Sequence, residues 1–273
     1  MAGVKTTIIP GRPRLAVDEA GDGKLLVFMH GIGGNRTNWR DQVPVFGEKF
    51  RAVAWDARGY GDSDDYDGPL DFADFSADLV RVLDHYGARK ALLCGLSMGG
   101  RIAQDFYERH PDRVAAMVLV ATMPSFGEGL TDAQRAEFIR LRKEPLVNGK
   151  EPKDIAPVVA KTLLGPGASA ESFDRLVASM TALHKESYIK TIEASMGYRR
   201  TTAMAAIKAP VLLIFGEEDK LTTPATGKRM HAAIPGSRYV EIAGAGHLVN
   251  IEEPRQFDAA VMPFLLEHQG LAG

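Results

Sequence analysis

A glycine-flanked serine is the most chemically informative feature of the sequence. Ser97 follows an apolar run at residues 91–94 and precedes apolar residues with helical spacing. Gly95 and Gly99 flank it, and a serine on a sharp strand-to-helix turn needs such neighbours, because its strained backbone brings other backbone close by. The pattern predicts a nucleophile elbow, with the hydroxyl of Ser97 exposed above a strand end as the attacking group.

A serine hydroxyl needs a base to remove its proton at neutral pH, usually a histidine that a carboxylate orients. The late part of the chain offers both groups. An apolar run at 211–215 leads into an acidic turn that ends at Asp219, and a glycine-rich stretch then delivers His247. We expect Asp219 to orient His247, since this chain order of serine, acid and histidine accompanies such elbows. Glu217 and Glu218 are the alternatives for the orienting acid.

A second glycine-rich segment has the composition of an oxyanion hole. Residues 30–34 read His-Gly-Ile-Gly-Gly and follow an apolar run. The glycines permit a tight turn, so we expect the amide N–H of Ile32 to point at the same place as that of Met98. His30 itself is expected to anchor the turn and not to transfer protons.

The elements that would position these residues alternate between strands and helices. Six apolar runs have the composition of buried strands: 25–29, 50–55, 91–94, 114–121, 211–215 and 239–242. Helical patterns between most of them predict a parallel sheet with helices on both faces. Ser97, Asp219 and His247 follow such runs, at the carboxyl ends where open sheets bind ligands.

Between the fourth and fifth of these runs the strand pattern gives way to helical patterns. This indicates a helical cap at 124–205, inserted into a core domain of residues 1–123 and 206–273. Thr131 and Gln134 have the spacing of a capping box at the first cap helix.

A cap over the pocket mouth would set specificity. Candidate substrate-binding residues are Phe138, Met180, Met196 and Leu248. The first three could instead form the core of the cap. Arg199 and Arg200 are candidates to receive an acidic substrate group, with a solvated charged face as the other interpretation.

Composition bounds the class of protein and its partners. With 273 residues, of which 45% are hydrophobic, the chain can build one large α/β domain with an insertion. The net charge of −2 is spread without a basic block, which argues against nucleic acid and anionic membranes as partners. We expect a small-molecule substrate, no metal or cofactor, and a cytoplasmic location, with a homo-oligomer left open. The single Cys94 excludes an intramolecular disulfide.

Five landmarks together resemble the α/β-hydrolase fold superfamily, in its usual order: His30-Gly31, the stretch 56–63, the elbow at 95–100, the turn at 216–219, and Gly246-His247. The resemblance implies a mostly parallel eight-stranded sheet covered by helices, with an inserted helical cap. Within the superfamily, the stretches around Asp56 and Ser97 and the residues after His247 are most similar to 3-oxoadipate enol-lactonases and related esterases. Those lactonases often have Asn-Ser where this chain has His30-Gly31.

The resemblance implies a serine hydrolase that cleaves a small carboxylic ester or lactone through an acyl-enzyme, with Ser97 as nucleophile. Epoxide hydrolases and dehalogenases share part of the pattern but use an aspartate nucleophile. Carbon–carbon hydrolases of ring-cleavage products share Ser-Met-Gly-Gly and are an alternative. A ligand sensor and a cofactor-free oxygenase or perhydrolase are further alternatives on the same fold.

Overall fold

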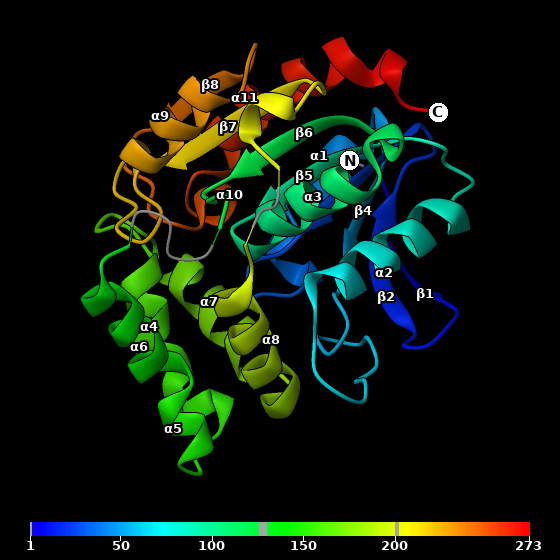
Figure 1. Ribbon diagram of the computed structural model, residues 1–273. Coiled ribbons are helices and arrows are strands. Elements are labelled where there is room, and N and C mark those ends of the chain that lie inside the picture. The colour runs from blue at the N-terminus through cyan, green and yellow to red at the C-terminus, as the bar shows by residue number, and fades with distance from the viewer. Residues whose placement is uncertain (1, 126–129, 200–201) are drawn as a thin grey trace.

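Eight strands form a single sheet in the computed structural model, which describes residues 2–125, 130–199 and 202–273 (Figure 1). The strands are β1 (Lys5–Ile9), β2 (Leu15–Ala20), β3 (Lys24–Met29), β4 (Phe50–Trp55), β5 (Ala91–Leu96), β6 (Val114–Val120), β7 (Val211–Gly216) and β8 (Arg238–Ile242). Their order across the sheet is β1-β2-β4-β3-β5-β6-β7-β8. Each of the six expected apolar runs forms one of these strands.

In their order across the sheet, the strands β4, β3, β5, β6, β7 and β8 run parallel to one another. Every residue of β5, β6 and β7 is buried, because helices cover both faces of the sheet at its centre. The expectation of a mostly parallel, doubly covered sheet is confirmed.

The first two strands are not among the expected runs. They form an antiparallel hairpin whose second strand also pairs antiparallel with β4. Polar pairs link the hairpin: the hydroxyl of Thr6 donates to Asp18, and that of Thr7 to Glu19. Polar residues in β1, which is an edge strand, and in β2 break up the apolar runs that a search of the sequence would detect.

Helices pack on both faces of the sheet. They are α1 (Gln42–Phe46), α2 (Phe72–His85), α3 (Met98–Arg109), α9 (Pro224–Ala233), α10 (Val249–Glu252) and α11 (Pro254–His268), with short 3-10 turns η1 (Arg36–Trp39), η2 (Pro111–Arg113) and η4 (Gln269–Leu271). In Figure 1, α2 and α3 lie in front of the sheet while α1 and α11 lie behind it. Phe28 of β3 packs against Trp39, which in turn contacts Phe257 of α11.

Between β6 and β7 the chain forms a helical layer, called here the inserted segment. It contains α4 (Asp132–Arg142), α5 (Glu144–Val147), α6 (Pro152–Leu163), α7 (Ala170–Thr181), α8 (Lys185–Gly197) and η3 (Met204–Ala206). Helices α4 to α8 stand beyond the carboxyl ends of the central strands (Figure 1). Thr131 and Gln134 form the expected capping box at the start of α4. Among the described residues, no helix has both the length and the apolar character needed to cross a membrane.

Candidate active site

Ser97 occupies the turn between β5 and α3 in a strained conformation. Its φ of 54° and ψ of −109° lie outside the regions that residues with a Cβ normally adopt. Two hydrogen bonds hold the turn: the Ser97 amide donates to Val120 O at 2.8 Å, and the Thr122 hydroxyl donates to Ser97 O at 2.7 Å. The neighbouring strand β6 therefore fixes the serine at the carboxyl edge of the sheet.

The flanking glycines are required by close backbone approach. A Cβ on Gly95 would collide with the backbone of Gly99, and a Cβ on Gly99 would collide with the backbone of Met29 in β3. The helix α3 can begin immediately after Ser97 only because both positions lack a side chain. The strand, turn and helix expected around Ser97 are all present.

Asp219 and His247 form a buried hydrogen-bonded pair. The Oδ2 atom of Asp219 lies 2.8 Å from Nδ1 of His247, and both residues are 4% exposed. The other carboxylate oxygen, Oδ1, accepts the amides of Leu221 and Thr222, and the hydroxyl of Thr222 donates to Oδ2 at 2.6 Å. This cradle fixes the carboxylate, which in turn fixes one nitrogen of the imidazole and leaves the other facing away from Asp219.

The loop that carries His247 is fastened to the inserted segment. The amide of His247 donates to Leu163 O at 2.8 Å. The carboxylate of Glu252 accepts the amides of Gly165, Gly246 and Leu248 at 2.7–3.0 Å. Burial raises the pKa of Glu252, and these three amide donors oppose that shift.

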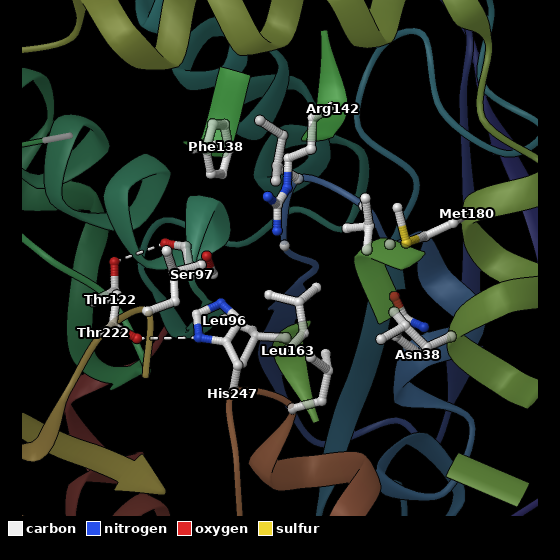
Figure 2. Close-up of a pocket in the computed structure, with 18 of the residues that line it drawn as sticks. Asn38, Leu96, Ser97, Thr122, Phe138, Arg142, Leu163, Met180, Thr222 and His247 are labelled. Atoms are coloured by element: carbon white, nitrogen blue, oxygen red, sulfur yellow. Dashed lines mark hydrogen bonds between the residues drawn. The ribbon is translucent and has the colours of Figure 1, made fainter. Parts of the chain in front are cut away.

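Ser97 and His247 line the same cavity between the sheet and the inserted segment. Figure 2 shows the imidazole of His247 below Ser97, with Phe138, Arg142 and Met180 on the other sides. The rest of the wall is formed mainly by apolar side chains, among them Leu96, Met123, Val159, Leu163, Leu176, Leu221 and Leu248. A largely apolar cavity of this kind strengthens the electrostatic effect of each polar group that enters it.

Two backbone amides next to the serine have no acceptor among the described residues. Met98 is the first residue of α3, where an amide has no partner within the helix. Ile32 lies in the turn after β3, where its carbonyl accepts the hydroxyl of Tyr60 at 3.0 Å. Gly31 passes so close that a Cβ there would lie 3.4 Å from Cβ of Ser97.

His30 holds this turn with both ring nitrogens. Nδ1 lies 2.8 Å from Gly31 O, and Nε2 accepts the amide of Ala57 at 3.1 Å. Burial lowers the pKa of His30 to about 4, so the ring is neutral near pH 7. With both nitrogens occupied, His30 serves as the expected anchor.

A sequence model of the alpha/beta hydrolase fold family matches residues 24–254. The chain belongs to that family. This alpha/beta hydrolase is 30% identical to 3-oxoadipate enol-lactonase 2 of Acinetobacter baylyi over 243 residues, 88% of each chain. It is 27% identical to the 2-hydroxy-6-oxononadienedioate/2-hydroxy-6-oxononatrienedioate hydrolase of Klebsiella pneumoniae over 276 residues, 92% of this chain and 91% of the other. A thermophilic esterase from Thermogutta terrifontis superposes with a TM-score of 0.84 at 25% identity, covering 98% of this chain and all of the other.

The cavity of this alpha/beta hydrolase contains most of the expected substrate-binding residues. Phe138, Met180 and Leu248 line it. Met196 is not part of the described wall and packs, partly buried, against the hydrophobic core. The reason is its place on α8: Tyr188 of that helix reaches the cavity, and Met196 lies about 12 Å farther along the helix.

The two arginines proposed to receive an acidic group do not reach the described cavity. Arg199 is exposed and donates to the backbone of Met196 and Tyr198, and Arg200 lies outside the described residues. Arg142 lines the cavity instead, and sequence reasoning missed it. Its spacing of four residues from Phe138 was the available signal, because such residues share a helix face.

Proposed function

We propose that this alpha/beta hydrolase is a serine hydrolase that cleaves a small carboxylic ester or lactone through an acyl-enzyme. The observation that carries the proposal is the buried pair of Asp219 and His247, whose atoms Oδ2 and Nδ1 lie 2.8 Å apart. His247 lines the same cavity as Ser97, which lies in a strained turn. A serine held in a strained turn at the cavity wall, with an oriented imidazole in the same wall, is suited to activation as a nucleophile.

In this mechanism the proton of the Ser97 hydroxyl passes to the His247 nitrogen that faces away from Asp219, while the oxygen attacks the ester carbonyl. Asp219 holds the tautomer and stabilises the imidazolium. The imidazolium then donates its proton to the departing alkoxide, which leaves the acyl group on Ser97. Water, deprotonated by His247, releases the acid and restores the serine.

The tetrahedral intermediates carry a negative oxygen that needs preorganised donors. The amides of Ile32 and Met98, which have no acceptor among the described residues, are suited to this role, because neither needs to break a hydrogen bond to those residues. The Tyr60 hydroxyl bound to Ile32 O keeps the first of these peptides in place. The inserted segment, which includes most of the expected cap at 124–205, would act as the cap that shapes the pocket for the substrate.

The relatives support this class of chemistry, since their names include an enol-lactonase and an esterase. The Klebsiella pneumoniae relative, named as a hydrolase of an oxo-dienedioate, supports a second candidate, hydrolysis of a carbon–carbon bond in such a compound. Both candidates use Ser97, and they differ in which bond is broken.

A substrate panel with a matched variant tests the proposal. Purified protein and Ser97→Ala would be assayed with short-chain aryl esters, small lactones, an enol-lactone acid and a ring-cleavage dienoate. We expect turnover of esters or lactones that the variant lacks, and labelling of Ser97 alone by a fluorophosphonate probe. Turnover of the dienoate alone would replace the proposal with carbon–carbon hydrolysis, and the same ester turnover in Ser97→Ala would overturn the mechanism.

A further inference from the structure

Arg142 is a buried cation that lines the cavity and forms no ion pair with the described residues. Its side chain comes from the last turn of α4 and reaches into the space between Phe138, Ser97 and Met180 (Figure 2). The residue is 4% exposed. Its guanidinium carbon lies 4.2 Å from the centre of the Phe138 ring, and the structure gives it no hydrogen bond or ion pair with the described residues.

Among the described acids, none forms an ion pair with Arg142. Glu137 of the same helix is bound through both carboxylate oxygens to Arg140, at 2.6 Å each, on the exposed side. The described wall of the cavity contains the guanidinium-bearing Arg142 and no carboxylate. The cavity is therefore electropositive as well as largely apolar, and it favours an anion.

A second donor near Arg142 lacks a partner. The hydroxyl of Tyr188 is buried without a hydrogen bond among the described residues, although Tyr188 lines the same cavity. Burial raises the pKa of Tyr188 to about 12, and the positive charge of Arg142 opposes that rise, which places the two groups within electrostatic reach. Burial likewise lowers the pKa of Arg142.

An unpaired buried guanidinium and an unsatisfied buried hydroxyl are both costly, and proteins retain such groups where a ligand completes them. A carboxylate has the planar, two-oxygen shape that a guanidinium binds in a bidentate manner, and it also accepts a hydroxyl. We propose that Arg142 and Tyr188 form a binding site for a carboxylate of the substrate. The substrate is then a monoanionic ester or lactone, with its reacting carbonyl at Ser97 and its carboxylate at Arg142.

This inference rests on the proposed ester or lactone chemistry, so its test uses a ratio of two substrates. The probes are p-nitrophenyl monoesters of succinate, glutarate and adipate, each matched to the p-nitrophenyl ester of the neutral fatty acid of the same chain length. The ratio of kcat/KM values within a matched pair reports carboxylate recognition alone, because both members undergo the same reaction. We expect the best pair to favour the carboxylate ester by about 10- to 100-fold in the wild type.

Three variants locate the effect. Arg142→Met removes the charge and keeps an apolar stem, and we expect it to reduce the preference to about 1. Arg142→Lys keeps the charge without the planar fork and should retain part of the preference. Arg140→Met, two residues away and exposed, is the matched control and should keep the full preference. A preference that survives in Arg142→Met would overturn the inference.

A binding measurement separates failure of this inference from failure of the proposed function. Glutarate and its neutral dimethyl ester would be titrated into Ser97→Ala by calorimetry, a readout that needs no turnover. We expect glutarate to bind, the diester to bind at least 10-fold more weakly, and Tyr188→Phe to weaken glutarate by about 3- to 10-fold. Equal binding of glutarate and its dimethyl ester would overturn the inference, even if the enzyme cleaves esters. Selective binding of glutarate would uphold the inference, even if the enzyme cleaves no ester.

The thermal stability of Arg142→Met distinguishes a ligand-binding arginine from one that only stabilises the fold. Because Arg142 has no acidic partner among the described residues, its replacement by methionine should raise Tm by about 2 °C or more in the absence of ligand. Glutarate should then raise Tm in the wild type and not in the variant. A fall in Tm without ligand would assign Arg142 to packing and contradict the inference.

Discussion

The amide of His247 donates a 2.8 Å hydrogen bond to the carbonyl oxygen of Leu163, at the end of α6. The candidate base is thus attached to the inserted segment as well as to the core. Glu252 strengthens the attachment, because its carboxylate accepts one amide from the inserted segment and two from the loop around His247.

We therefore expect Glu252→Gln to impair turnover without touching the substrate. An amide side chain presents an N–H₂ group to one of the three backbone donors, which loses that hydrogen bond and moves the His247 loop. The variant should lower kcat by about 10-fold and the free energy of unfolding by about 1–3 kcal/mol. Steady-state kinetics and urea unfolding measure both. Glu253→Gln is the control, because the carboxylate of Glu253 accepts a hydrogen bond from the side chain of Gln256 and contacts none of the three amides.

The strain at Ser97 predicts a difference between two inactive variants. Ser97→Ala keeps a Cβ in the strained conformation at φ 54°, whereas Ser97→Gly removes it. Both should lose turnover by a factor of about 10⁴ or more, but the glycine variant should be more stable than the alanine variant by about 1 kcal/mol. Urea denaturation of the pair tests this, and an alanine variant as stable as the glycine variant would contradict it.

The identity of the orienting acid can be tested in the turn after β7. Asp219→Asn should lower kcat by roughly 10⁴-fold, because an asparagine favours the wrong tautomer of His247. Glu218→Gln, one residue earlier in the turn, should leave kcat nearly unchanged. Kinetics on the best ester of the panel distinguish the two, and a large loss in Glu218→Gln with a small one in Asp219→Asn would exchange their roles.

Buried His30 predicts a loss of stability in acid. Its folded pKa of about 4 lies below the unfolded value of 6.5, so between these pH values the unfolded chain binds the proton first. Stability should fall by up to about 3 kcal/mol as pH drops through this window, and His30→Gln should show a shallower fall. The free energy of unfolding, measured from pH 7 to pH 4.5, checks this against the exposed control His85→Gln.

Asp258 on α11 predicts the opposite slope. Burial raises its pKa from 3.8 to about 7, so its contribution to stability is greatest below pH 3.8 and is lost as pH rises through 7. Asp258→Asn should therefore be more stable than the wild type at pH 8 by about 1–2 kcal/mol, after allowance for solvent screening. The gain should disappear near pH 4, and the exposed Asp22→Asn should show none.

The sequence was informative where local pattern and fold agree. The run before Ser97, its glycines and the helix after it are adjacent in the chain, so composition alone predicts the elbow. Asp219 and His247 were predictable for a related reason, since each lies in the loop that follows a strand and the carboxyl ends of parallel strands meet at one edge of the sheet.

Contacts between distant segments were the part that sequence could not supply. Helix α4 carries Arg135, Arg140 and Arg142, and only its packing against the core decides that Arg142 turns into the cavity. The three backbone amides that donate to the carboxylate of Glu252 likewise come from positions that only the folded chain brings together. Met196 was misplaced because a helical pattern does not indicate how far along a helix the cavity extends.

The attachment of His247 to the inserted segment uses Leu163 O and Gly165 N, which are main-chain atoms. Any residue at position 163 supplies the same carbonyl, whereas Gly165 must stay small because a Cβ would lie 2.9 Å from Gly246 N. Mutation can therefore change the side chains of this segment, Arg142 included, while the loop that carries His247 keeps its main-chain hydrogen bonds to the segment. Substitutions in the inserted segment can therefore change which substrate is bound while the position of His247 stays the same. In this way new specificities can evolve without a change in the fold.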